Sequence, residues 1–260
     1  DTAGDKPFFI WYAPFLPHTP HNPPERLLSK YKVEGKSIHV ARYQAMCEWF
    51  DETCGELLGY LDKKKLSEDT LVVFVADNGW IQKEKSRGSD ARSKRSPFDG
   101  GTRTPVMLRW PGKLKAARHD TLVSSIDLAP TILAAAGLEA HPEMQGVNLL
   151  DVCAAGGKSA RNKIFGEIFE HDVGKIDDPV PGLLYRWCIS GQWKLILPHR
   201  GSPVISRKRK STYRDPIWAV PQLFNLGADP HERSNLAAAE ADRVKALSSD
   251  IESWWKVEKP

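Results

Sequence analysis

The sequence from Leu71 to Pro105 reads LVVFVADNGWIQKEKSRGSDARSKRSPFDGGTRTP, and the interpretation of the whole chain depends on it. It opens with an unbroken apolar run, Leu71–Ala76, which is too short for a helix and rich in valine. Such a run predicts a strand buried on both faces, as in a parallel sheet. Asp77, Asn78 and Gly79 follow at its C-terminal end, where open α/β sheets place their ligands. The stretch therefore predicts a binding site at the end of a central strand.

The Asp-Asn-Gly sequence also allows a second interpretation, a tight hairpin turn, because Asn-Gly is a strong turn signal. That turn needs a partner strand directly after it, whereas the segment from Trp80 to Ser96 is polar, charged and without alternation. The ligand-site interpretation is therefore favoured. Beyond this polar segment, which contains Lys94, a Gly100-Gly101 turn leads to a second predicted strand, Val106–Trp110.

The composition is that of a globular protein with a nearly balanced charge. The 260 residues suffice for one large domain, or for one domain with a smaller appendage. Lys and Arg number 37 against 33 Asp and Glu, and part of this surplus lies in Arg207–Lys210, for which a solvated loop is favoured over an anionic partner. No apolar run approaches membrane-spanning length, and no segment resembles a nucleic-acid-binding module.

The four cysteines, Cys47, Cys54, Cys153 and Cys188, show neither zinc spacing nor a dense disulfide framework. Cys47 and Cys54 are too far apart along a predicted helix to pair with each other. They do not indicate a compartment. Because the chain begins at Asp1 without a methionine or a signal peptide, we interpret it as part of a longer protein.

Two elements and a loop are predicted before the central stretch. Pro7–Ala13 (PFFIWYA) predicts a buried strand, and Val40–Lys64 an amphipathic helix, so that strand, helix and strand imply a right-handed parallel crossover. Between them, the proline-rich loop Pro14–Pro24 carries His18 and His21. A stiff loop just past a strand end places both histidines where they can act, although ordinary surface residues remain an equal alternative.

The second half of the chain predicts a different architecture. Asp127 is expected to cap a helix over Leu128–Ala136, and the glycine- and alanine-rich segment Val147–Asn162 predicts a boundary. Short strand-like runs then predict a small antiparallel sheet, closed by an amphipathic helix within Leu236–Val257. These runs are Lys163–Phe169, Leu184–Ile189, Trp193–Pro198 and Gln222–Asn225. The organisation expected is an α/β domain over residues 1–155 and a small α+β subdomain over 156–260.

Four segments together resemble the type I sulfatases, the formylglycine-dependent enzymes of the alkaline phosphatase-like superfamily. They are APFLPHTPHNPP (Ala13–Pro24), VFVADNG (Val73–Gly79), KRSPFDGGTRTPVMLRWPG with SSIDLAPTILAAAG (Lys94–Gly112 and Ser124–Gly137), and LFNLGADPHERSNLA (Leu223–Ala237). The resemblance implies an α/β fold with a mostly parallel sheet between helices. A small antiparallel C-terminal subdomain with a closing helix would follow it.

The resemblance also implies roles for particular residues. Asp77 and Asn78 match divalent-metal ligands, usually for Ca²⁺, a hard cation that takes oxygen ligands. Lys94 matches the lysine that contacts the substrate sulfate, and His18 the histidine that acts on the leaving-group oxygen. His21 and Arg103 match less specific positions at the substrate pocket. Alternatively, Arg103 only stabilises the glycine turn.

The chain departs from the family pattern in its nucleophile. None of the four cysteines stands in the family's Cys/Ser-x-Pro/Ala-x-Arg motif, and the paired N-terminal aspartates are absent. Both the formylglycine and these metal ligands are expected in a segment before Asp1, so the chain alone is expected to be inactive.

The function implied is hydrolysis of sulfate esters, of a sulfated small molecule or glycan, by a secreted or periplasmic protein. The alternatives are a phosphonate or phosphodiester hydrolase of the same superfamily, and a non-catalytic module that binds a sulfated glycan. The sequence does not indicate the oligomeric state.

Overall fold

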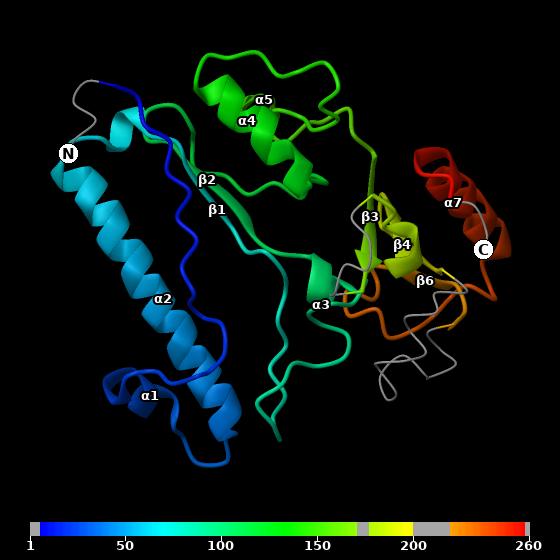
Figure 1. Cartoon of the computed structure of the whole chain (residues 1–260), viewed down its shortest axis with the longest axis horizontal. Helices are drawn as coiled ribbons and strands as arrows, with labels where there is room; N and C mark the ends of the chain where they lie inside the picture. The colour runs from blue at the N-terminus through cyan, green and yellow to red at the C-terminus, as the bar shows by residue number, and fades with distance from the viewer. Residues whose placement is uncertain (1–5, 171–176, 200–218, 258–260) are drawn as a thin grey trace. The chain divides into compact units, whose positions relative to one another are not determined.

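A computed structural model describes residues 6–170, 177–199 and 219–257 (Figure 1). The basic loop Gly201–Asp215 lies outside these residues. The chain forms two compact units, one of Asp1–Leu66 with Gln82–Gly88, the other of Ser67–Ile81 with Ser89–Pro260. The predicted boundary between residues 155 and 156 stays a prediction. No helix in the described part is long and apolar enough to cross a membrane.

The first unit is built on two helices, α1 (Glu25–Tyr31) and α2 (Ile38–Lys63), and α2 confirms the predicted amphipathic helix. Leu27 and Leu28 of α1 pack on Ala41 and Ala45 of α2, where the small alanines allow close approach. The Ser37 side chain accepts a hydrogen bond from the backbone N–H of His39, so a serine caps α2 at its start.

The strand expected over Pro7–Ala13 is not formed. These residues make no ladder in the described chain, and their apolar side chains face solvent, with Phe9 69% and Trp11 83% exposed. A strand requires a neighbour that accepts its backbone hydrogen bonds, and none of the described residues supplies one. The run is therefore extended without being part of a sheet.

The central stretch forms β1 (Val72–Val75), which pairs with β2 (Val106–Arg109). The pairing is antiparallel, with Val72 opposite Arg109 and Val75 opposite Val106, so the expected parallel crossover is not seen among the described residues. Residues 76–105 form a wide excursion between the two strands and contain the short helix α3 (Asp99–Thr102). The turn at Asp77 therefore begins a hairpin whose partner strand returns only after this excursion.

Two helices follow, α4 (Leu128–Ala135) as predicted and α5 (Leu149–Ala154), which the sequence did not predict and which lies within the segment Val147–Asn162. Asp127 does not cap α4. It ends the short 3₁₀ helix Ser125–Asp127, where its buried carboxylate accepts hydrogen bonds from the N–H groups of Ser124 and Val147, each at 2.8 Å. Asp127 also forms an ion pair with Arg161 at 2.5 Å, so it ties three segments together. Two further 3₁₀ turns span Ser67–Asp69 and Val180–Gly182.

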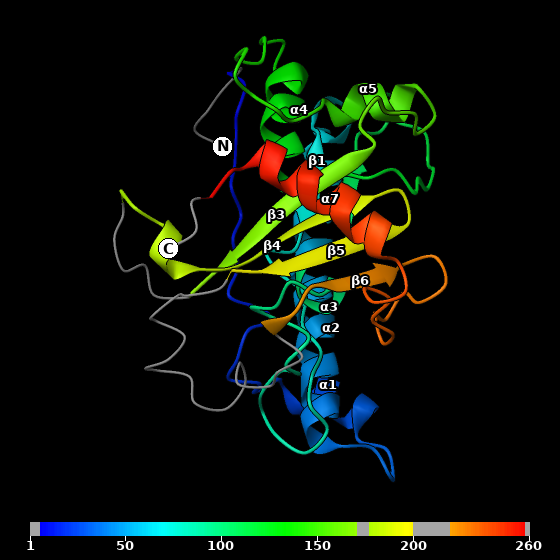
Figure 2. The ribbon, with the colours of Figure 1, turned by 90° about the vertical axis from the view of Figure 1, so that its right-hand side faces the viewer.

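The C-terminal part is an antiparallel sheet, as predicted, and its four strands lie in the order β3-β4-β5-β6. Its strands are β3 (Lys163–Phe169), β4 (Leu183–Ser190), β5 (Trp193–Pro198) and β6 (Gln222–Asn225). Helix α7 (Ala241–Trp254) lies across one face of this sheet (Figure 2).

Neighbouring residues along β5 and β6 point to opposite faces of this sheet. Leu195 and Leu223 pack with Leu247 and Ile251 of α7. On the other face, Ile196 and Phe224 pack with Phe98, which immediately precedes α3. The sheet is thus attached to the excursion that carries the predicted site.

Candidate functional site

The turn after β1 presents two oxygen donors. The backbone N–H of Asn78 donates to Asp77 Oδ1 at 2.8 Å, and Asn78 Nδ2 donates to the Gly79 carbonyl at 3.0 Å. The amide nitrogen of Asn78 is therefore engaged within the turn, while its Oδ1 receives no hydrogen bond from a described residue. The exposed Asp77 carboxylate lies beside it in sequence, so a carboxylate and an amide oxygen are presented together.

Glycines bring this turn against the segment that contains Lys94. The N–H of Gly79 donates to the Gly101 carbonyl at 2.9 Å, and the N–H of Ile81 donates to the buried Ser93 hydroxyl at 2.7 Å. A Cβ at Gly79 would lie 2.3 Å from the Gly100 carbonyl oxygen, and one at Gly101 would lie 2.2 Å from that of Ser93. Only glycine allows this approach of backbone to backbone.

Lys94 follows the buried Ser93 and is itself half-buried. Its ammonium makes no ion pair or hydrogen bond with any residue in the described ranges. Because the two hydrogen bonds from Gly79 and Ile81 join its segment to the Asp77 turn, the structure places an unpaired cation and the two oxygen donors on adjoining segments of one unit.

Arg103 lies at the end of the glycine turn. Its backbone N–H donates to the Asp99 carbonyl at 2.9 Å, and its guanidinium, 69% exposed, lies 3.7 Å from the Asp99 carboxylate. These contacts are what a brace of the turn would make. A contact with substrate stays a prediction.

The two histidines of the proline-rich loop belong to the other unit. His18 is exposed, its Nδ1 lies 2.8 Å from the Thr19 carbonyl, and its ring lies 5.1 Å from that of Phe15. The ring of His21 lies 5.4 Å from that of Tyr43 on α2. Burial first, and then the nearby imidazoles of His18 and His39, lower the pKa of His21. A lowered pKa makes His21 a neutral ring at neutral pH, and the roles expected of both histidines stay predictions.

The described residues fit part of a calcium site. They contain no cluster of three or more His, Cys, Asp or Glu side chains that could hold a metal. The donor chemistry of Asp77 and Asn78 is nevertheless the oxygen type that Ca²⁺ prefers, and Ca²⁺ takes roughly six to eight such ligands. The turn could therefore supply a minority of the ligands.

The cysteines are poor nucleophiles in this structure. All four are free thiols, and burial raises the pKa of Cys47, Cys54 and Cys153. Burial raises the pKa of Cys188 to about 12. Since the thiolate is the reactive form, these raised pKa values favour the less reactive thiol form of each cysteine.

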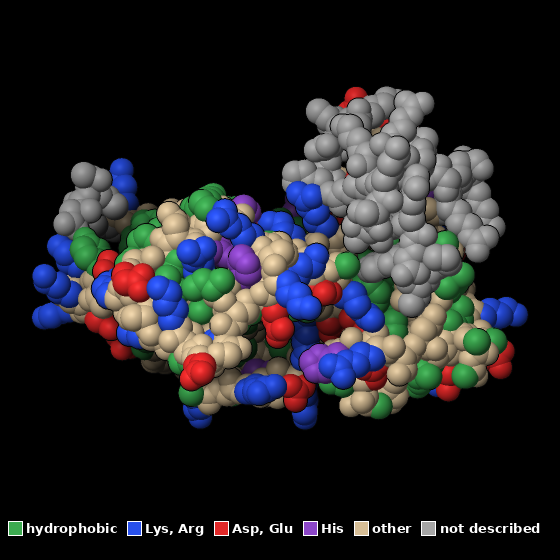
Figure 3. Space-filling model, turned by 90° about the horizontal axis from the view of Figure 1, so that it is seen from below, with side chains coloured by type: hydrophobic (Ala, Val, Ile, Leu, Met, Phe, Trp, Pro, Cys, Tyr) green, Lys and Arg blue, Asp and Glu red, His purple; other side chains and the backbone are tan. Residues whose placement is uncertain are grey.

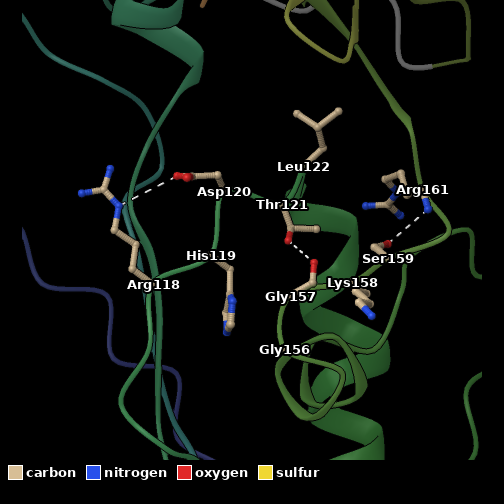
Figure 4. Close-up of a pocket in the computed structure, with 10 residues that line it drawn as sticks. All are labelled: Arg118, His119, Asp120, Thr121, Leu122, Gly156, Gly157, Lys158, Ser159 and Arg161. Atoms are coloured by element: carbon tan, nitrogen blue, oxygen red, sulfur yellow. Dashed lines mark hydrogen bonds and ion pairs between the residues drawn. The ribbon is translucent and has the colours of Figure 1, made fainter.

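The structure also contains a pocket that the sequence did not predict, with a volume of about 520 Å³ (Figure 4). Segments 118–122 and 156–161 line it, and the Thr121 hydroxyl donates to the Gly157 carbonyl on its wall. Its lining includes none of Asp77, Asn78 and Lys94. The pocket's most buried cation, Arg161, is engaged by Asp127, so the pocket is not a strong candidate for the reaction site.

Surface charge does not single out another site on the face drawn in Figure 3, where Lys and Arg side chains alternate with Asp and Glu. The sequence also missed a buried ionic group of Asp99, Lys194 and Glu232. Two of its members lie in the quoted motifs, Asp99 beside the glycine pair and Glu232 in LFNLGADPHERSNLA. Their position in these motifs is the sequence signal that could have indicated them.

Two family models and several known proteins match this chain. Residues 1–138 match the family model described as Sulfatase, and residues 91–196 match the model described as N-sulphoglucosamine sulphohydrolase, C-terminal. The N-acetylgalactosamine-6-O-sulfatase of Bacteroides thetaiotaomicron is 27% identical over 96% of this chain and 47% of its own length. Human arylsulfatase A is 28% identical over 94% of this chain and 48% of its own. The chain thus spans about half the length of these curated relatives.

Solved structures share the fold. Ps i-CgsB superposes with a TM-score of 0.67 at 22% identity, over 94% of this chain and 49% of that one. BT4656, solved with its substrate D-glucosamine-2-N,6-O-disulfate, gives a TM-score of 0.61 at 24% identity, over 84% of this chain and 40% of that one. The alkaline phosphatase-like fold is confirmed, and the chain belongs to the sulfatase family of that superfamily.

Proposed function

We propose that the full-length protein hydrolyses sulfate esters of a carbohydrate. One observation carries the proposal. Lys94, which has no partner among the described residues, lies on a segment that hydrogen bonds join to the turn carrying the oxygen donors Asp77 and Asn78. These bonds run from Gly79 to Gly101 and from Ile81 to Ser93. A lysine ammonium and a bound divalent cation would together favour a tetrahedral anionic group, such as the singly charged sulfate of a sulfate ester, over a neutral substrate.

Each residue has a part in this proposal. The Lys94 ammonium binds sulfate oxygens as a point charge and stabilises negative charge that develops on them. Asp77 and Asn78 would hold a divalent cation, which we propose to be Ca²⁺. When bound, that cation supplies Lewis-acid polarisation of the sulfate. His18 protonates the departing alcohol oxygen, and His21 contributes to substrate binding.

The nucleophile is proposed to be a formylglycine. None of the cysteines here lies in the required motif, so we assign it to a part of the polypeptide outside residues 1–260.

A carbohydrate substrate is supported by the relatives. One is an N-acetylgalactosamine-6-O-sulfatase, and the structural neighbour BT4656 was solved with a sulfated glucosamine. A sulfated glycan or sugar is therefore the proposed ligand, and a secreted or periplasmic location the proposed setting.

The test is release of inorganic sulfate from 6-sulfated N-acetylgalactosamine by the full-length protein, with Asp77→Asn and, as matched control, Asp120→Asn. Asp120 is a strongly exposed carboxylate of the same unit. Loss of a metal contribution worth several kcal/mol predicts a roughly hundredfold or larger fall in kcat/KM for Asp77→Asn. Asp120→Asn should match the wild type.

Equal activity of the two variants would remove Asp77 from the site. A larger kcat/KM for a phosphonate monoester than for the matched sulfate ester would replace the proposal by its superfamily alternative. Binding of the sulfated sugar without any turnover would favour the non-catalytic module.

A further inference from the structure

A buried ionic cluster joins the C-terminal sheet to the segment that carries Lys94. Lys194 on β5 is fully buried, and its ammonium lies 2.6 Å from Asp99 Oδ1 and 2.9 Å from Glu232 Oε1. Asp99 is 9% exposed and Glu232 2% exposed. One cation is therefore shared by two carboxylates from segments far apart in sequence, and all three groups are almost completely removed from water.

Glu232 also holds the backbone at the start of α3. Its Oε2 accepts a hydrogen bond from the N–H of Asp99 at 2.7 Å. Glu232 itself has a φ of 54°, in the left-handed region that residues with a side chain seldom adopt. The surrounding turn supports this conformation, because the Glu232 N–H donates to the Asp229 carbonyl at 3.0 Å and the Ser234 N–H to the Asp229 carboxylate at 2.8 Å. The fold thus imposes an unfavourable backbone conformation at the residue that binds α3.

The other end of the same segment is attached to Glu232 as well. Arg92 donates a hydrogen bond to the Glu232 carbonyl, and its guanidinium lies 4.0 Å from the ring of Phe98 and 5.8 Å from that of Phe224. Arg92 precedes Lys94 by two residues and Asp99 follows it by five. Lys94 therefore lies within a short loop whose two ends are both fixed on Glu232.

We propose that Lys194 and Glu232 are positioning residues for Lys94, acting as a clamp on residues 92–99. The clamp serves the proposed function, since it sets the place of an ammonium that has no side-chain partner of its own among the described residues. Stability alone is a weak reason for such a cluster, because well-packed apolar residues often replace buried ion pairs without loss. Misplacement of a binding group by about 1 Å can cost roughly a hundredfold in rate, so a rigid attachment has a direct use.

The experiment compares Lys194→Met with Arg161→Met in the full-length protein. Both remove a buried cation of the same unit from a buried carboxylate, but Arg161 pairs with Asp127, away from the clamp. Because Lys194→Met leaves two carboxylates unpaired and could fail to fold, Glu232→Gln, which keeps the side-chain size, is made in parallel. The readouts are the inhibition constant of inorganic sulfate, kcat/KM for a sulfate ester, and hydrogen exchange of the peptide spanning residues 92–102.

We expect Lys194→Met and Glu232→Gln to accelerate exchange in this peptide, weaken sulfate inhibition and lower kcat/KM by roughly ten- to a hundredfold. Arg161→Met should do none of these at a comparable loss of melting temperature. Equal behaviour of the clamp variants and Arg161→Met would overturn the proposal. If the wild type neither cleaves sulfate esters nor binds sulfate, the proposed function fails, and the exchange comparison alone then supports or overturns the clamp.

Discussion

Gly79→Ala is the most informative single change at the predicted site. The added Cβ would lie 2.3 Å from the Gly100 carbonyl oxygen and 2.9 Å from its carbon, both of them backbone atoms that no rotamer change can move. Relief requires a shift of about 1 Å, since carbon and oxygen atoms in contact lie about 3.3 Å or more apart. That shift separates the Asp77 turn from the Lys94 segment and weakens the 2.9 Å bond from Gly79 to Gly101.

The expected stability loss follows from these two effects. Overpacking costs about 1–3 kcal/mol, and the weakened hydrogen bond about 0.5–1.5 kcal/mol, so the sum is roughly 2–4 kcal/mol. At about 2–4 °C per kcal/mol, the melting temperature should fall by roughly 4–16 °C. Because the two halves of the site move apart, kcat/KM for a sulfate ester should fall by about a hundredfold.

The assay is thermal unfolding together with steady-state kinetics of the full-length protein, with Gly182→Ala as the control. A Cβ at Gly182 meets no atom within 4 Å, so this variant should unfold and react as the wild type does. A Gly79→Ala protein within about 0.5 kcal/mol and twofold of the wild type would refute the close approach of the two segments.

Three further predictions follow from the same structure. His18→Ala should lose far more rate on a sugar sulfate than on nitrophenyl sulfate, because general acid catalysis is worth roughly a hundred- to ten-thousandfold only where the leaving oxygen needs a proton; equal losses in kcat/KM would make His18 a loop-packing residue. His21 has a lowered pKa in the fold, so unfolding protonates it as the pH falls below 6.5, and stability should decline from there toward the lower folded pKa. His21→Gln should reduce this decline in urea titrations between pH 5 and 8, and an unchanged pH profile would contradict the shift. Lys194→Met should lower the free energy of unfolding in urea by about 3–5 kcal/mol at pH 7 and by less near pH 5, because burial already raises the pKa of Glu232 and protonation removes its unpaired charge. A loss that does not depend on pH would contradict an ionised Glu232 as the cause.

The sequence predicted the elements whose patterns are local. The four C-terminal strands and helix α2 lie within two residues of their predicted bounds, because short apolar runs between turns and apolar residues at three- and four-residue spacing are local signals. Such signals do not report which strand will be the neighbour. An apolar run such as Leu71–Ala76 fits a parallel or an antiparallel partner, and the returning strand β2 lies beyond a long excursion.

Of the candidate site, too, only the parts with local sequence signals were predicted. Asp77, Asn78 and Lys94 were predicted from motifs, and the glycines that join their segments are visible in the sequence. The clamp was not predicted, because Lys194 sits in the strand WKLILP, where a lysine ordinarily indicates an exposed position. Its partner Asp99 is 95 residues away, so only the tertiary structure brings the charges together.

The central claim is that Lys94 binds the sulfate group, and Lys94→Ala against Lys115→Ala tests it most directly. Lys115 is an exposed lysine of the same unit, so the two variants remove the same charge from the protein. In the full-length protein, Lys94→Ala should weaken inhibition by inorganic sulfate and lower kcat/KM for a sulfated sugar by roughly a hundred- to a thousandfold, while Lys115→Ala changes neither. A Lys94→Ala protein that keeps both the sulfate inhibition constant and kcat/KM of the Lys115→Ala control would contradict the account.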